Sequence, residues 1–359
     1  MMLKKITPFV FFLFVISGAH SQTPQLLMDI NTDSSAIDLY DASLLEFNGN
    51  AYFDANDGIS GNELWATDGT SAGTHAVTDI WPGNGSSNPR GRIAYNGLIY
   101  FSANDSIHGT ELWATDGTSS GTFMVKDIYA GQNGSAVNNF VLNNNRMFFS
   151  ASDSIFGNEL WSTDGSDTGT VMVKDINPGT ASGFCSGFIV HNGKMYFTAK
   201  TDTTGYELWI SDGTSEGTHM VKDIFPGTGD GYSYGQWCEY DNKLFFSAND
   251  GVHGFELWKT DGTGVGTEMV IDLYNGQTAS YPSGIVVYNG LIYFPGADNV
   301  NGRELWSSDG TAAGTLLVKD INAGLAGSFP LGLTVYNDKL FFRANENISG
   351  AELWSTDGL

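Results

Sequence analysis

The sequence is poor in basic residues and in cysteine, and it lacks the apolar spacing of a helix. Only 16 Lys and Arg stand against 40 Asp and Glu, which gives a net charge of −24. So acidic a surface repels phosphate, and this excludes a nucleic-acid partner. Two cysteines and six scattered histidines show no metal-ligand spacing, so no zinc site is expected. Cys185 and Cys238 fall too far apart along neighbouring strands for a disulfide, and we expect two free thiols.

Long apolar runs are also missing. The stretch 9–16 follows two lysines and precedes small residues, and it is much shorter than the ~20 residues needed to span a bilayer. This order predicts a secretory signal peptide over residues 1–21, cleaved near Ser21, rather than a membrane-anchor helix. We therefore expect residues 22–359 to be secreted or displayed on the outer surface, without a membrane span.

Glycine and aromatic residues are abundant instead. The 46 Gly show no three-residue period, which excludes collagen, and 23 Phe, 15 Tyr and 9 Trp exclude disorder. The triplet Glu-Leu-Trp recurs seven times, always 48 or 49 residues apart. Its tryptophans are Trp65, Trp113, Trp161, Trp209, Trp258, Trp306 and Trp354. A fixed period of this length indicates a repeat architecture.

Each repeat contains four short runs rich in aromatic and β-branched residues. In the second repeat they cover residues 92–95, 98–103, 110–115 and 122–128. Asn96-Gly97 separates the first two runs, and Asp116-Gly117 lies between the last two, as expected for tight turns. Four antiparallel strands in about 40 to 50 residues are typical of one blade of a β-propeller.

The two ends of the chain complement each other. Residues 25–30 align with the fourth run of a repeat, whereas the last repeat stops at Leu359 without a fourth run. We therefore predict an all-β, seven-bladed propeller over residues 22–359, with four strands per blade and the N-terminal strand completing the last blade. The alternative, an open linear array, would leave an unpaired edge strand.

The repeated residues are expected to be structural. The seven tryptophans should pack between blades, with an aromatic ligand platform as the alternative. Asp68 and its counterparts should accept backbone N–H bonds within a turn. Glu111 and Glu159 are expected to lie opposite Lys126 and Lys174 on the neighbouring strand.

Calcium is a further candidate, because an exported acidic protein meets this ion and the loops after the second run carry carboxylates and glycines. No other cofactor is expected. The calcium candidates are Asp57, Asp105, Asp153 and Asp250.

Residues that break the repeat are better functional candidates than residues that follow it. They concentrate in the connections between one repeat and the next, where exposed rings suit sugars or peptide side chains and arginines can hold a carboxylate. The ligand-binding candidates are Arg90, Arg92, Tyr232, Tyr234, Trp237 and Tyr281. Tyr40, Phe184 and Phe329 stand at places matching Tyr281, and wedging between blades is the alternative for this matched set.

The stretch Glu63-Leu-Trp-Ala-Thr-Asp-Gly-Thr70 resembles the signature of the ELWxxDGT-repeat proteins, and its pattern holds in five repeats. The resemblance implies an exported or surface-attached bacterial protein, typical of Bacteroidota, without an established activity. We predict a monomeric, non-catalytic binding or adhesion protein that recognises a glycan or a surface protein through its inter-repeat connections. The alternatives are a hydrolase or lyase acting on glycans, and a purely structural surface module.

Overall fold

The computed structural model describes residues 26–37, 43–232 and 237–358. Within them the chain forms 27 strands and no helix, and hence no helix long and apolar enough to cross a membrane. The strands make seven antiparallel sheets, here called blades 1 to 7, each built from one repeat. The all-β prediction is confirmed. The predicted signal peptide, Tyr40 and Tyr234 lie outside the described residues.

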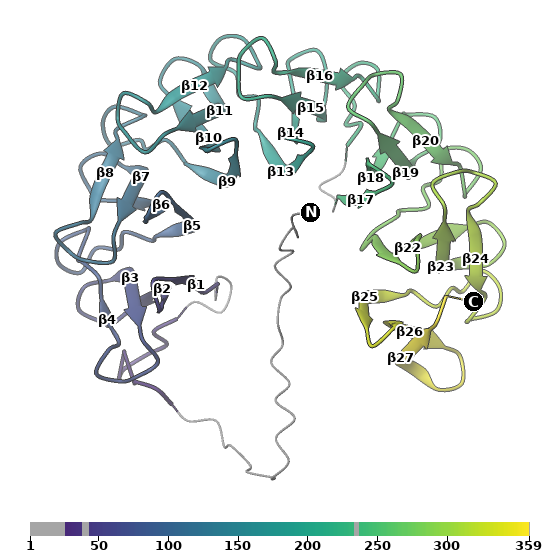
Figure 1. Cartoon of the computed structure of the whole chain (residues 1–359), viewed down its shortest axis with the longest axis horizontal. Coiled ribbons are helices and arrows are strands. Elements are labelled where there is room, and N and C mark those ends of the chain that lie inside the picture. The colour runs from purple at the N-terminus through teal and green to yellow at the C-terminus, as the bar shows by residue number, and fades with distance from the viewer. Residues whose placement is uncertain (1–25, 38–42, 233–236, 359) are drawn as a thin grey trace, which may run out of the picture.

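The strands of a blade, here called A to D, run outward in chain order (Figure 1). Strands A are β1 (Leu45–Phe47), β5 (Arg90–Tyr95), β9 (Asn138–Asn143), β13 (Ser186–His191), β17 (Cys238–Tyr240), β21 (Val286–Tyr288) and β25 (Leu331–Tyr336). Strands B are β2 (Asn50–Asn56), β6 (Leu98–Asn104), β10 (Arg146–Asp153), β14 (Lys194–Ala199), β18 (Lys243–Asn249), β22 (Leu291–Asp298) and β26 (Lys339–Glu346).

Strands C carry the Glu-Leu-Trp triplets. They are β3 (Asn62–Thr67), β7 (Thr110–Thr115), β11 (Gly157–Thr163), β15 (Glu207–Ser211), β19 (Phe255–Thr260), β23 (Gly302–Ser308) and β27 (Gly350–Thr356). Strands D are shorter and lie at the outer rim (Figure 1). They are β4 (His75–Ala76), β8 (Phe123–Lys126), β12 (Val171–Lys174), β16 (His219–Lys222), β20 (Glu268–Ile271) and β24 (Leu316–Lys319).

The blades follow one another along an arc that is open between blade 1 and blade 7 (Figure 1). Seven four-stranded sheets in a closed ring were predicted, but blade 7 has only the strands β25, β26 and β27. Residues 26–30 form no strand. Residues 30–36 pack on blade 1 instead, where Ile30 contacts Phe53 and Trp65 and the Ala36 carbonyl accepts the Asn56 N–H at 2.8 Å. The predicted closure by the N-terminal strand is therefore not formed in this structure.

The A–B turns follow the sequence prediction. Asn96 and Gly97 both have positive φ, 48° and 80°, as a two-residue hairpin turn requires. In the C–D turn, Asp116 Oδ1 accepts the Thr118 N–H at 2.8 Å and the Thr118 hydroxyl at 2.7 Å. The predicted turn role of this aspartate is confirmed.

Apolar clusters fill the space between consecutive blades. In the first of them, Leu64 of blade 1 is fully buried against Phe101 and Ala103 of blade 2, and Trp113 packs at its margin. Each fully buried Leu or Phe contributes about 1.5–3 kcal/mol. Most tryptophans of the triplet lie between sheets in the same way, which holds neighbouring blades at a fixed distance.

The pairing predicted for the repeated lysines is wrong by one residue. A bulge between Leu112 and Trp113 places Lys126 opposite Leu112 rather than Glu111. Lys126 instead reaches blade 3, where its Nζ lies 3.0 Å from Asp167 Oδ1. Glu111 is thereby left to bind a different part of the chain.

Candidate functional site

The two arginine candidates do not converge on one ligand. Arg92 joins blades 1 and 2, with Nη1 3.2 Å from Asp54 Oδ1 and Nη2 2.8 Å from the Ser43 carbonyl, and this ion pair is almost fully buried. Arg90 is exposed and lines a separate pocket of about 490 Å³ together with Asn133 and other polar residues. A bidentate carboxylate site made by both arginines is thus not formed.

Tyr232 and Trp237 form a stacked pair between blades 4 and 5. Tyr232 is only 4% exposed, and its ring lies 5.0 Å from that of Trp237. The indole N–H of Trp237 donates to the Gly187 carbonyl at 2.7 Å. Burial raises the pKa of Tyr232 well above its usual range. The main role of both rings is therefore packing in the interior of the protein.

The matched aromatic residues Phe184, Tyr281 and Phe329 are exposed rather than wedged between blades, at 46%, 59% and 59%. All three have left-handed backbones, with φ of 50°, 51° and 50°. This conformation is unfavourable for a bulky side chain and is held by the surrounding structure. Each backbone N–H donates to the preceding repeat, as from Tyr281 to the Phe255 carbonyl at 3.1 Å.

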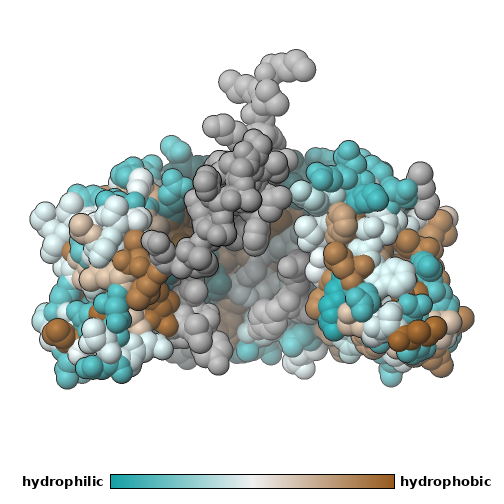
Figure 2. Space-filling view, turned by 90° about the horizontal axis from the view of Figure 1, so that it is seen from below, coloured by the Kyte–Doolittle hydropathy of each residue, from teal (hydrophilic) through white to brown (hydrophobic). Residues whose placement is uncertain are grey.

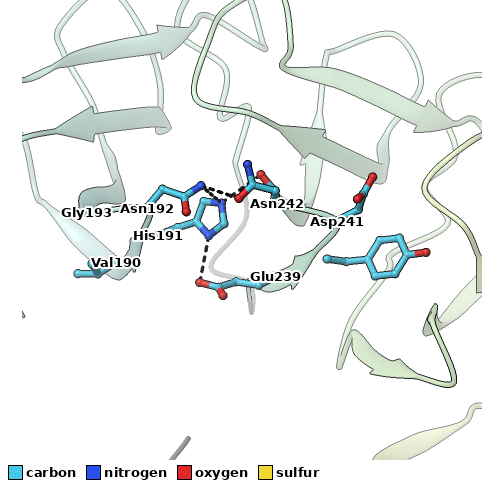
Figure 3. Close-up of a pocket in the computed structure, with 8 residues that line it drawn as sticks. Val190, His191, Asn192, Gly193, Glu239, Asp241 and Asn242 are labelled. Atoms are coloured by element: carbon cyan, nitrogen blue, oxygen red, sulfur yellow. Dashed lines mark hydrogen bonds and ion pairs between the residues drawn. The ribbon is translucent and has the colours of Figure 1, made fainter. Parts of the chain in front are cut away.

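A polar pocket that the sequence did not predict lies between blades 4 and 5, at their A–B turns (Figure 3). Its volume is about 590 Å³. The lining residues are Val190, His191, Asn192, Gly193, Glu239, Tyr240, Asp241 and Asn242. Six of these residues, including Tyr240 with its hydroxyl, carry side-chain oxygen or nitrogen atoms that suit a hydrogen-bonding ligand.

His191 and Glu239 meet across the boundary between the two blades (Figure 3). His191 Nδ1 lies 3.2 Å from Glu239 Oε1, and Nε2 lies 3.2 Å from the Asn242 carbonyl. The Asn192 amide nitrogen also lies 3.0 Å from Nε2, so the imidazole contacts groups of both blades. The imidazole is buried, whereas the Glu239 side chain is 54% exposed. The Glu239 carboxylate therefore lies beside the imidazole and is open to solvent.

The pocket arises where the repeat is broken. Tyrosines occupy the position of His191 in several blades, and their hydroxyls donate to the turn of the next blade, as from Tyr95 to the Asn145 carbonyl at 2.6 Å. Val287 and Val335 occupy the position of Glu239. A comparison of strands A across the repeats identifies both substitutions, whereas the ligand-binding residues predicted from sequence lie in or next to the inter-repeat connections.

A second set of carboxylates is buried and repeated. Glu63, Glu111, Glu159, Glu207, Glu256 and Glu304 are fully buried, and each binds the connection that leads to the next blade. Glu111, for example, accepts the N–H groups of Ile128 at 2.8 Å and Ser135 at 2.9 Å. Burial raises the pKa of Glu111 to about 7, although these hydrogen bonds act in the opposite direction. These carboxylates hold the scaffold together.

The calcium candidates cap their own loops. Asp57 Oδ1 accepts the N–H groups of Ile59 at 2.8 Å and Ser60 at 2.7 Å, and these bonds hold the pKa of Asp57 below its usual value. In the second repeat, Asp105 Oδ2 lies 2.7 Å from His108 Nδ1. Among residues 26–37, 43–232 and 237–358, no three His, Cys, Asp or Glu side chains gather as a metal site.

No protein-family model and no curated protein matches the sequence. The chain is similar in structure to the computationally designed Ika8 protein (14% identity, 90% of this chain and 88% of that one, TM-score 0.43). It is also similar to puromycin hydrolase (13%, 91% and 53%, TM-score 0.44). A third match is the β-propeller domain of the Trilobed protease from Pyrococcus furiosus (10%, 91% and 97%, TM-score 0.39), whose topology is described as open velcro.

These likenesses concern the fold, and seven antiparallel sheets around a common centre fit a β-propeller. The chain spans about half the length of puromycin hydrolase. The prediction of a non-catalytic binding or adhesion protein is contradicted, since two of the three matches are by name a hydrolase and part of a protease. At 13% and 10% identity, neither the hydrolase activity nor the protease activity is assigned to this chain.

Proposed function

We propose that the protein is a hydrolase or lyase that acts on a glycan, with its site in the pocket between blades 4 and 5. The observation that carries this proposal is the contact between His191 Nδ1 and Glu239 Oε1 at 3.2 Å, within a pocket open to solvent. A carboxylate fixed by an imidazole can exchange a proton with a bound molecule in a defined direction.

The lining of the pocket suggests the substrate class. Asn192, Asn242, Asp241 and Glu239 supply both donors and acceptors, and their amide and carboxylate planes suit the closely spaced hydroxyl groups of a sugar. The apolar part of the wall is small, since Val190 is the only aliphatic side chain in this lining. A hydroxyl-rich ligand therefore fits better than an apolar one.

Two reactions are compatible with these groups. In hydrolysis, Glu239 accepts a proton from the attacking water while Asp241, as the second carboxyl group, gives one to the leaving oxygen. In elimination, Glu239 removes a carbon-bound proton next to a carboxyl group of the sugar, Asp241 gives a proton to the leaving glycosidic oxygen, a carbon–carbon double bond forms, and no water is consumed. His191 positions Glu239 in both.

Purified protein incubated with a panel of polysaccharides tests the proposal. Hydrolysis releases reducing ends alone, whereas elimination also gives ultraviolet-absorbing unsaturated products. Glu239→Gln should abolish either signal. Glu46→Gln is the matched control, because Glu46 stands at the same repeat position in blade 1 without a histidine beside it. No turnover on any polysaccharide, or equal turnover by wild type and Glu239→Gln, contradicts the assignment.

His191→Asn tests the positioning role separately. Asn143 occupies the same repeat position in blade 3 and contacts the next turn, with Nδ2 3.2 Å from the Gly193 carbonyl, so this variant preserves the contact between blades. We expect an unchanged melting temperature, a kcat reduced about 10- to 100-fold and a shifted pH profile. A change in stability alone would assign His191 to the scaffold.

We also propose that residues 1–21 direct export and that the chain belongs with the ELWxxDGT-repeat proteins, which the repeated signature supports. N-terminal sequencing of protein recovered outside expressing cells tests the first part. We expect a mature N-terminus close to Gln22. An intact Met1 would contradict export by this signal.

A further inference from the structure

Every connection between consecutive blades is held by one buried glutamate. The glutamate on strand C of a blade accepts the N–H of the residue 17 positions ahead, at 2.8–3.3 Å. It also binds the backbone N–H or the hydroxyl of the residue 24 positions ahead. We call this arrangement the carboxylate clamp. It fixes both ends of the connections 80–87, 128–135, 176–183, 224–231, 273–280 and 321–328.

The far end of each connection also binds the blade that it leads to. The Ser87 carbonyl accepts the Asn104 N–H of blade 2 at 3.0 Å, and Ile80 packs with Phe101 and Ala103 of the same blade. The other five connections make the equivalent backbone bond. Each connection is therefore bound by the glutamate of the preceding blade and by a backbone hydrogen bond to the following blade.

Residues 30–36 have the form of a seventh connection. The Ala36 carbonyl accepts the Asn56 N–H of blade 1 at 2.8 Å, and Ile30 packs with Phe53 and Ala55. These are the repeat counterparts of the contacts made by Ser87 and Ile80. Among the described residues, however, the backbone N–H groups of Ile30 and Ala36 have no acceptor. The connection has its blade but lacks its glutamate.

Blade 7 has the opposite deficit. Glu352 stands in the Glu-Leu-Trp triplet of β27 and is exposed, although its six counterparts are fully buried. The adjacent Leu353 is 75% exposed, whereas the leucines of the other triplets are 0% exposed. Figure 2 looks into the opening of the arc and shows apolar residues in brown on both lobes beside it. Blade 7 thus has a glutamate and an apolar face without a connection.

We propose that Glu352 is the clamp for residues 30–36 and that it closes the arc into a ring by accepting the N–H groups of Ile30 and Ala36. Residues 26–29 then add to β27 as the missing strand D. The register of β23 with β24 in blade 6, where Leu305 faces Lys319 and Trp306 faces Leu317, places Met28 opposite Leu353 and Leu26 opposite Trp354.

The occupant of blade 7 is the N-terminal segment of the same chain rather than of a second copy. Residues 30–36 are already fixed on blade 1, which borders the opening on the side facing blade 7 (Figure 1). The tether gives the segment a high effective concentration next to β27, so an intramolecular contact is favoured over a bimolecular one. The six existing clamps supply the geometry that the seventh repeats.

A cysteine pair tests the closure directly. Met28→Cys with Leu353→Cys should form an intramolecular disulfide under mild oxidation, because directly opposed residues of antiparallel strands lie within disulfide reach. Asp29→Cys with Leu353→Cys is the register control and should remain reduced. Cys185 and Cys238 are buried and take no part. A monomer that stays reduced, or a disulfide-linked dimer on a non-reducing gel, overturns the proposal.

Glu352→Gln tests the clamp without removing an apolar side chain. In a closed ring it should lower the urea midpoint by about as much as Glu111→Gln, since both variants replace a carboxylate that accepts backbone N–H groups. Glu346→Gln is the control and should have little effect, because Glu346 is a half-buried carboxylate at the turn of the same hairpin, where it accepts the Ser349 hydroxyl at 2.9 Å. A neutral Glu352→Gln beside a destabilising Glu111→Gln overturns the role of Glu352.

Discussion

Glu111 illustrates how one repeated side chain determines both the geometry and the pH response of the molecule. The residue is fully buried in an acidic protein, and burial raises its pKa from 4.5 to about 7. The pKa values of Glu159, Glu207 and Glu256 are raised to about 7 for the same reason. These four carboxylates therefore bind protons near neutral pH in the folded protein, while the same side chains in an unfolded chain are ionised.

This difference predicts that the protein is more stable at pH 5 than at pH 8. The folded state binds protons that the unfolded state has released above about pH 4.5, so the stabilisation is complete below that pH and is lost as pH rises through about 7. Urea unfolding at both pH values measures it. Glu111→Gln should reduce the difference between the two urea midpoints by the contribution of one carboxyl group. A higher urea midpoint at pH 8 than at pH 5 in the wild type would contradict the prediction.

Phe329 carries a second prediction at this scale. Its φ of 50° is unfavourable for a bulky residue, and its ring is exposed. Asn88 adopts φ of 47° at the same repeat position, and asparagine tolerates this conformation better. Phe329→Asn should therefore raise the free energy of unfolding by about 1 kcal/mol. Phe123→Asn, at an exposed position within β8, is the control and should not stabilise the protein. A loss of stability in Phe329→Asn would show that the ring packs usefully.

At the scale of elements, the sequence predicted the strands and turns well because each repeat states them independently. Asn-Gly at the A–B turn and Asp-Gly at the C–D turn specify local backbone conformations that need no distant partner. The bulge between Leu112 and Trp113 was not predictable in this way. It depends on the strand register, and it turned an expected ion pair of Glu111 with Lys126 into a clamp on the next connection.

The candidate site shows the same limit. His191 and Glu239 are 48 residues apart, and they meet only because strands A of consecutive blades lie next to each other. Each residue by itself looks like a harmless change from Tyr or Val. The exposed aromatic residues, by contrast, were recognised from sequence, but their left-handed backbones follow from the connection geometry and not from the residue type.

The loops between strands B and C give a prediction about calcium. Asp57 and Asp105 already accept backbone N–H groups, and His108 occupies the second oxygen of Asp105. Added Ca²⁺ should therefore leave the melting temperature unchanged, and a chelator should not reduce turnover. Asp57→Asn, which keeps the N–H acceptor, should melt like the wild type. A rise in melting temperature with Ca²⁺ that Asp57→Asn removes would assign the ion to these loops.

At the scale of the whole molecule, six of seven blade boundaries repeat one another and the seventh is open. The ends that face the opening carry complementary parts, with the connection on blade 1 and the glutamate on blade 7. Closure would bury the apolar face around Leu353 and would also remove the unpaired edge of β27. We therefore expect the protein to form a closed ring in solution.

The distance across the opening tests this claim most directly. Spin labels at Ile59→Cys and Ile348→Cys would sit on the exposed B–C loops of blades 1 and 7, and labels at Ile59→Cys and Ile107→Cys on those of the neighbouring blades 1 and 2. The native thiols do not interfere, because burial raises the pKa of Cys185 well above its usual value and that of Cys238 to about 11. Double electron–electron resonance should give similar distances for the two pairs. A clearly longer distance between blades 1 and 7 than between blades 1 and 2 would contradict the ring.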